Sequence, residues 1–78
     1  MIKFFTADWC TACTALKRTL GEDILAELEV IDADNEPDEV ISNNIRSIPT
    51  LIKFNEAGEE VSRRVGSMSV TEFSSWAK

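Results

Sequence analysis

Apolar positions in the first 31 residues are spaced as a strand, a helix and a second strand. Residues 2–7 are apolar or β-favouring on both alternating faces, which is typical of a strand buried on both sides. Residues 11–20 predict a helix that stops at Gly21, with its apolar side chains on one stripe. Those side chains are Cys13, Leu16 and Leu20. A short strand follows at residues 28–31, so this part predicts a βαβ unit with a parallel strand pair and a right-handed crossover.

Residues 34–39 predict the start of a second helix. They offer a capping side chain, Pro37 in the first turn, and acidic residues where the helix dipole is positive. We expect Val40, Ile41 and Ile45 to form the buried face of this segment.

The last third of the chain predicts a hairpin and a final helix. Residues 50–54 and 61–65 read as strands, and the loop at residues 55–58 has the usual hairpin composition. Residues 69–72 form a capping box that opens a helix. The side chains expected to face inward are Val70, Phe73 and Ala77. The predicted element order is β-α-β-α-β-β-α, an α/β protein.

Length and charge narrow the classes of function. The chain has 78 residues, enough for one domain, and its 44% hydrophobic content supports a single core. The net charge of -6 argues against a nucleic-acid partner, which would need a basic face. The apolar opening stops at Thr6, too short for a signal-peptide core or a spanning helix. We therefore expect a cytoplasmic monomer with no membrane association and no bound cofactor.

The main candidate chemistry lies in the two cysteines, Cys10 and Cys13, in a chain without histidine. Cys10 is expected at the N-cap or first position of the first helix, where free N–H groups and the dipole stabilise a thiolate. Cys13 lies one turn along and further inside, within reach of Cys10. This asymmetry predicts that Cys10 attacks a substrate disulfide and that Cys13 then displaces the product.

Three other interpretations of the pair remain open at this point, although the βαβ context favours a redox pair. A zinc site needs about four ligands, so two thiolates would require a second chain or carboxylates. A structural disulfide would close only a tiny loop and would be reduced in the cytosol. Two buried cysteines acting as small apolar residues are the third alternative.

Three stretches resemble the thioredoxin superfamily, and thioredoxin more than glutaredoxin. Residues 7–13 (Ala-Asp-Trp-Cys-Thr-Ala-Cys), 45–51 (Ile-Arg-Ser-Ile-Pro-Thr-Leu) and 64–67 (Arg-Val-Gly-Ser) match the active-site motif, the cis-proline loop and the substrate-facing glycine, in order. The resemblance runs over residues 1–78 and implies the minimal thioredoxin fold, a four-stranded mixed sheet flanked by three helices. The predicted fold lacks the extra first strand and helix of full-length thioredoxins.

Carried over to this chain, the resemblance implies a substrate-binding role for several residues around the cysteines. Trp9 would flank the nucleophile, Pro49 would be cis and pack against the disulfide, and the backbone of Ile48 would pair with an extended substrate segment. Beside Val65, Gly66 would let the substrate backbone approach closely.

The sequence also departs from the family pattern at positions that tune the chemistry. Thr11 and Ala12 occupy the motif interior, a pair that sets the redox potential across the family. The buried acid of thioredoxins falls at Phe4 and its lysine partner near Val30, and both are apolar here. We therefore hypothesise that Asp8 or a bound water assists deprotonation of the resolving cysteine. An unchanged pH profile of resolution in Asp8→Asn would exclude Asp8.

These features predict a dithiol–disulfide reductase of protein disulfides, recharged by a flavin-dependent thioredoxin reductase. An alternative is a glutaredoxin-like enzyme recharged by glutathione, whose carboxylates Lys17, Arg18 and Arg46 could hold. A second alternative is a non-enzymatic thioredoxin-fold binding module or metal carrier.

Overall fold

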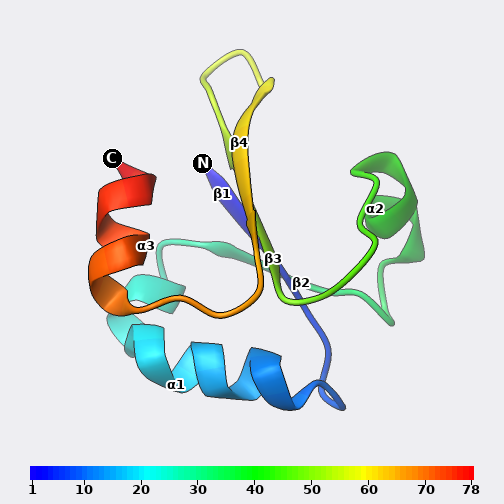
Figure 1. The fold of residues 1–78 in the computed structure, drawn as a ribbon. Coiled ribbons are helices and arrows are strands. Elements are labelled where there is room, and N and C mark those ends of the chain that lie inside the picture. Colours follow the sequence, from blue (N-terminus) through cyan, green and yellow to red (C-terminus); the bar gives the residue numbers. More distant parts are fainter.

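The computed structural model describes residues 1–78 and contains a four-stranded mixed sheet with helices on both faces (Figure 1). The elements in chain order are β1 (Ile2–Thr6), α1 (Thr11–Leu25), β2 (Glu29–Asp32), α2 (Pro37–Ser42), β3 (Thr50–Phe54), β4 (Glu60–Val65) and α3 (Val70–Ala77). The strands lie in the order β2-β1-β3-β4; β1 is parallel to β2 and antiparallel to β3, and β4 is antiparallel to β3. The predicted element order and fold class are confirmed.

One face of the sheet is covered by α1 and α3 (Figure 1). Phe4 of β1 and Leu51 of β3 are direct partners across these two strands, and both contribute side chains to this face. The buried cluster on it consists of Phe4, Leu16, Leu20, Leu51, Met68 and Phe73. Because burial of each large apolar side chain contributes about 1.5–3 kcal/mol to the stability of the folded state, this cluster is the main hydrophobic core.

The opposite face is covered by α2 (Figure 1). Its buried cluster consists of Phe5, Ile31 and Ile52, against which Val40, Ile45, Ile48 and Phe54 pack. Adjacent strand residues point to opposite faces, which explains why Phe4 and Phe5 belong to different clusters. The loop after α2, which contains Ile45 and Ile48, is therefore fixed to the sheet by its apolar side chains.

Charged side chains also hold α2 in place. Arg63 of β4 donates hydrogen bonds to the main-chain carbonyls of Asn43 (2.9 Å) and Asn44 (3.4 Å), just past the end of the helix. Lys3 of β1 donates to Glu39 Oε1 at 2.6 Å. This hydrogen bond raises the pKa of Lys3 above its ordinary value. Together these contacts attach α2 to both β1 and the edge strand β4.

Three predictions about helix positions need correction. Ile41 is 77% exposed and Val70 is 42% exposed, so neither belongs to a buried face. The N-cap of α2 is Glu36, and its side chain makes no capping hydrogen bond. Helix α2 is short and only Val40 and the later Ile45 turn toward the sheet, whereas Val70 occupies the exposed first position of α3.

Of two predictions about helix ends, the stop at Gly21 is confirmed in part and the capping box in full. Gly21 leaves helical geometry (φ 83°), as expected of a stop, but the chain resumes a helix that ends at Leu25. The capping box of Ser69 and Glu72 is present, with hydrogen bonds in both directions. The backbone hydrogen bond from Ser69 lowers the pKa of Glu72.

No helix in the fold has the length and apolar character needed to span a bilayer.

Candidate active site

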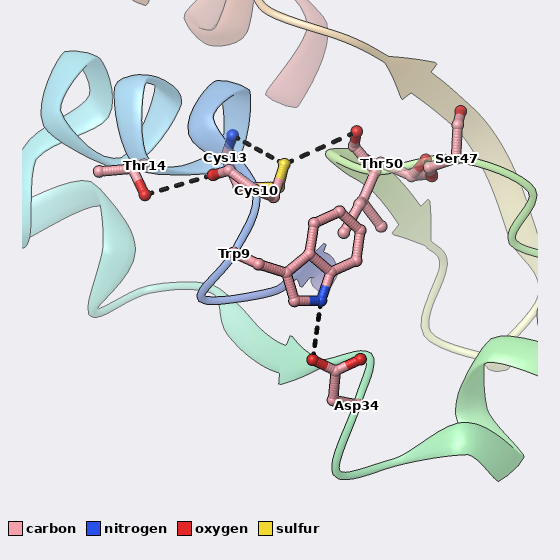
Figure 2. The surroundings of a disulfide bond; sticks show 8 residues. Trp9, Cys10, Cys13, Thr14, Asp34, Ser47 and Thr50 are labelled. Atoms are coloured by element: carbon pink, nitrogen blue, oxygen red, sulfur yellow. Dashed lines mark hydrogen bonds between the residues drawn. A yellow bond between two sulfur atoms is a disulfide. The ribbon is translucent and has the colours of Figure 1, made fainter.

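Cys10 caps the N-terminus of α1, where the chain leaves β1 and turns into the helix. Its backbone is extended, and its sulfur accepts a hydrogen bond of 3.1 Å from the main-chain N–H of Cys13 (Figure 2). The carbonyl of Cys10 in turn accepts hydrogen bonds from the main-chain N–H and the hydroxyl of Thr14. These contacts position the sulfur of Cys10 over the free N–H groups of the first turn, where negative charge is stabilised.

Cys10 and Cys13 form a disulfide bond, with their Cα atoms 5.2 Å apart. Cys13 is fully buried, whereas Cys10 retains 7% exposure. Both pack in one small cluster with Ala7, against which Ile48 lies. Cys10, at the helix cap, is therefore the less buried member of the pair, and Cys13 is the interior member.

The loop before β3 lies against the disulfide. The Ile48–Pro49 peptide bond is cis, and Cys10 Sγ lies 3.9 Å from the carbonyl oxygen of Ile48. The hydroxyl of Thr50 donates to the carbonyl of Ser47 at 2.6 Å, which holds the loop closed on itself.

Gly66 lies beside this loop at the end of β4. Its N–H donates to the carbonyl of Pro49 at 2.9 Å, and its φ of 92° is one that residues with a side chain rarely adopt. The preceding Val65 is exposed. The structure thus brings Gly66 and Val65 to the same end of the sheet as Pro49.

Trp9 precedes the nucleophile and is 69% exposed. Its indole N–H donates a hydrogen bond of 2.9 Å to Asp34 Oδ2, in the loop between β2 and α2 (Figure 2). A large aromatic ring held in this way presents apolar surface to solvent next to the disulfide. The ring is the largest exposed apolar side chain beside the disulfide.

A groove of about 380 Å³ opens beside the indole. It is mostly apolar, with one cationic side chain and one hydroxyl. Its lining residues are Trp9, Ala33, Val40, Ile45, Arg46, Ser47 and Ile48. Ile48 also packs against the cysteine cluster, so the groove and the disulfide share this side chain as a neighbour.

Most of the predicted site residues meet at the end of the fold that carries the disulfide, but the three expected to tune the chemistry are exposed to solvent. Asp8 is exposed and makes no side-chain hydrogen bond or ion pair, and Thr11 and Ala12 are exposed in the first turn of α1. Of the three cations considered for glutathione, Arg46 lines the groove and Lys17 and Arg18 do not.

Phe4 and Val30 lie opposite each other on β1 and β2. These are the positions at which the resemblance places the buried acid of thioredoxins and its lysine partner. Phe4 is fully buried. The buried residues include no aspartate, glutamate, lysine or arginine, so the interior holds ionisable groups only when the Cys10–Cys13 disulfide is reduced. The groups with shifted pKa values, Lys3, Glu60, Arg63 and Glu72, do not line the groove.

Sequence reasoning missed three residues of the site: Asp34, Ala33 and Val40. Asp34 lies in the segment predicted to begin the second helix, and its carboxylate accepts the hydrogen bond from Trp9. The available signal was its place after a parallel strand, because ligands of α/β sheets gather at the carboxyl ends of such strands.

The chain is similar to known thioredoxins in sequence and in structure. The sequence model of the family described as Thioredoxin matches residues 1–78. A thioredoxin of Chlamydia trachomatis is 41% identical over 71 residues, which cover 85% of this chain and 67% of that protein. The solved structure of a mutant thioredoxin from Halobacterium salinarum superposes with a TM-score of 0.84 at 28% identity, covering 97% of this chain and 69% of the other.

A longer relative is similar over the same region. The thiol:disulfide interchange protein DsbD of Photorhabdus laumondii is 29% identical over 82 residues, which cover 88% of this chain. The chain spans only 14% of the length of that protein.

Proposed function

The chain belongs to the thioredoxin family, and on that premise we propose that it reduces protein disulfides as a single domain over residues 1–78. Family membership and the Cys10–Cys13 disulfide make it a thiol–disulfide oxidoreductase. The direction of the reaction, its substrates and its electron donor form the proposal.

The proposed reaction consists of two thiol–disulfide exchanges. In the reduced protein the Cys10 thiolate attacks one sulfur of a target disulfide, forms a mixed disulfide and releases the first target thiolate. Cys13 then loses its proton and attacks the Cys10 sulfur, which breaks the mixed disulfide and releases the second target thiolate. The target gains two electrons, one proton from Cys13 and a second proton from water, and the protein ends with the Cys10–Cys13 disulfide.

The observation that carries this proposal is the hydrogen bond of 3.1 Å from the Cys13 N–H to Cys10 Sγ. The donor is fixed by the helix, so it stabilises negative charge on Cys10 in the attacking thiolate. Cys13, which is fully buried, has no such donor at its sulfur. The pair thus has one anionic attacker and one protected resolver.

The proposed substrate is an extended segment that runs beside Pro49. A main-chain group of the segment would pair with the backbone of Ile48, while Gly66 leaves room on the other side. An apolar side chain of the substrate would enter the groove next to Trp9. This mode of binding selects an unfolded or extended target around its disulfide.

Variants of the two cysteines test the proposal directly. Cys10→Ser is expected to abolish reduction of insulin disulfides, and Cys13→Ser is expected to accumulate a covalent mixed disulfide with its target. Retained turnover in Cys10→Ser would overturn the proposal. The equilibrium potential of the pair tests its direction: about -270 mV fits a reductant and about -120 mV an oxidant.

We further propose that the donor is a flavin-dependent thioredoxin reductase and that the protein acts as a cytoplasmic monomer. Its recharging by NADPH with thioredoxin reductase should exceed that by glutathione with glutathione reductase. Faster recharging by glutathione would instead favour the glutaredoxin-like alternative, with Arg46 in the groove as the candidate to hold a glutathione carboxylate.

A further inference from the structure

The groove beside Trp9 is lined by one charged side chain, that of Arg46. Five of its seven lining residues are apolar, and none is an acid. Arg46 is exposed, and its guanidinium forms no hydrogen bond or ion pair within the chain. The groove therefore combines an apolar surface with one positive charge that no group of the protein neutralises, an arrangement complementary to a bound segment of opposite charge.

The other cationic side chains of the protein do not line this groove. Several of them are held by glutamates or by main-chain carbonyls, namely Lys3, Lys53, Arg63 and Arg64. Arg18 resembles Arg46 in being exposed and without a partner, but it lies on α1 and not at the groove. Arg46 is therefore the one positive charge that a molecule bound beside Trp9 would meet.

The main chain on both sides of Arg46 is held in place. Before it, the N–H of Ile45 donates to the carbonyl of Val40 at 2.9 Å, and the Ile45 side chain packs against the buried cluster under α2. After it, the carbonyl of Ser47 accepts the hydroxyl of Thr50 at 2.6 Å. The guanidinium is thus free while its backbone is fixed, so binding a carboxylate there orders only one side chain of the protein.

The place of Arg46 in the loop sets how far its charge lies from the disulfide along a bound segment. Cys10 Sγ lies 3.9 Å from the carbonyl oxygen of Ile48, which follows Arg46 by two positions. Two residues of extended chain span at most about 7 Å. A target segment that runs beside this loop would therefore bring a side chain to Arg46 within about three residues of its own reacting cysteine.

We propose that Arg46 selects targets that carry an aspartate or a glutamate within about three residues of the reacting cysteine. This inference rests on the proposed function and specifies its substrate class: an extended segment with an apolar side chain in the groove and a carboxylate at the guanidinium. A guanidinium suits this task because it binds a carboxylate through two parallel hydrogen bonds. The protein as a whole has a net charge of -6 and does not attract acidic targets, so the preference depends on Arg46.

A basic side chain at the same position of the target should be disfavoured. It would place two cations side by side, and no carboxylate lines the groove to compensate them. Asp34 follows the lining residue Ala33, but its carboxylate already accepts the indole hydrogen bond from Trp9. The expected order of preference at this position is therefore acidic, then neutral, then basic.

Peptides whose single cysteine is activated as a pyridyl disulfide test this preference with the reduced protein. The Cys10 thiolate bonds to the peptide sulfur and expels pyridinethiolate, which takes a proton from water and is followed as thiopyridone by its absorbance. Each peptide carries leucine next to its cysteine and one glutamate, glutamine or lysine, placed two or three residues before or after that cysteine. Rates are compared at 0.1 M salt, where charges farther apart than about 10 Å are screened.

Wild type should react with the best-placed glutamate peptide about two- to fivefold faster than with its glutamine counterpart, the effect of an exposed ion pair. Arg46→Gln should remove this preference, and Arg46→Glu should reverse it in favour of lysine. Arg18→Gln is the matched control and should keep the preference, because Arg18 is equally exposed but does not line the groove. Dividing each rate by that of the same variant with uncharged dipyridyl disulfide removes any effect on Cys10 itself.

Three outcomes would overturn the inference: equal rates for the glutamate, glutamine and lysine peptides at every placement, a preference that survives in Arg46→Gln, or one that disappears in Arg18→Gln. Failure of the proposed function looks different. In that case wild type would leave insulin disulfides intact with either electron donor, whatever its preference among the activated peptides.

Discussion

The indole N–H of Trp9 donates a hydrogen bond of 2.9 Å to Asp34 Oδ2, which joins the loop before α1 to the loop after β2. The bond fixes the orientation of an exposed ring at the mouth of the groove. It also links two loops at the carboxyl ends of the parallel strands β1 and β2. The wall of the groove is therefore assembled from distant parts of the sequence.

Asp34→Ala should weaken substrate binding more than it affects the chemistry. Without its acceptor the indole is free to rotate, and we expect KM for insulin to rise about two- to fivefold while kcat changes little. Asp34→Asn, which keeps a carbonyl acceptor, should lie between wild type and Asp34→Ala. Equal KM values for all three proteins would show that the hydrogen bond does not position the ring.

Removing the Arg63 side chain should destabilise the attachment of α2. Its guanidinium donates to the carbonyl of Asn43 at 2.9 Å and to both carboxylate oxygens of Glu60 at 2.6 Å. We expect Arg63→Ala to lower the free energy of unfolding in urea by about 1–2 kcal/mol. Arg64→Ala is the matched control, because its ion pair with Glu72 is longer, at 3.5 Å, and solvent-exposed, so its loss should leave the free energy of unfolding nearly unchanged.

The Glu60–Arg63 pair also predicts a pH dependence of stability. The hydrogen bond from Arg63 lowers the pKa of Glu60 below its ordinary value of 4.5. A lowered carboxyl pKa stabilises the fold above the unfolded value, and this contribution is lost as the pH falls through the folded value. Wild type should therefore exceed Glu60→Gln in stability at neutral pH, by less than about 1 kcal/mol for so exposed a pair.

Urea unfolding of these two proteins from neutral to acidic pH measures that difference. It should be constant above about pH 5 and shrink toward zero on further acidification, because glutamine resembles the protonated acid. A difference that stayed constant at acidic pH would mean that Glu60 acts through packing and not through its charge.

Introducing an acid at Phe4 should unfold the protein instead of improving catalysis. Phe4 is fully buried in the cluster that joins the sheet to α1 and α3, and its partner on β2 is Val30. Phe4→Asp removes a large apolar side chain and buries an unpaired charge, which should cost about 4 kcal/mol or more. That loss approaches the whole stability of a small domain, about 5 kcal/mol.

Phe4→Leu is the control for packing alone and should lose only about 1–1.5 kcal/mol. Circular dichroism and urea titration distinguish the two variants. A folded Phe4→Asp protein with faster resolution at Cys13 would contradict this prediction.

The local pattern of the sequence was sufficient to predict the strands, the capping box and the position of Cys10 at a helix start. These features depend on residues close together in the chain, such as Ser69 and Glu72. Ile41 and Val70 were placed wrongly because a short helix can turn either side toward a sheet, and only packing decides which. The Trp9–Asp34 contact joins residues 25 positions apart: the place of Asp34 after a parallel strand indicates a site residue, but not that Trp9 is its partner.

The absence of buried aspartate, glutamate, lysine and arginine simplifies the energetics of the redox cycle. Titrations of the surface carboxylates and amines contribute nearly equally to the unfolding curves of the oxidised and reduced forms. Subtracting one pH–stability curve from the other should therefore cancel the contribution of the surface groups and leave the contribution of Cys10 and Cys13. Calorimetry, with no chromophore or reporter reagent, would then measure how strongly folding favours each ionisation state of the dithiol.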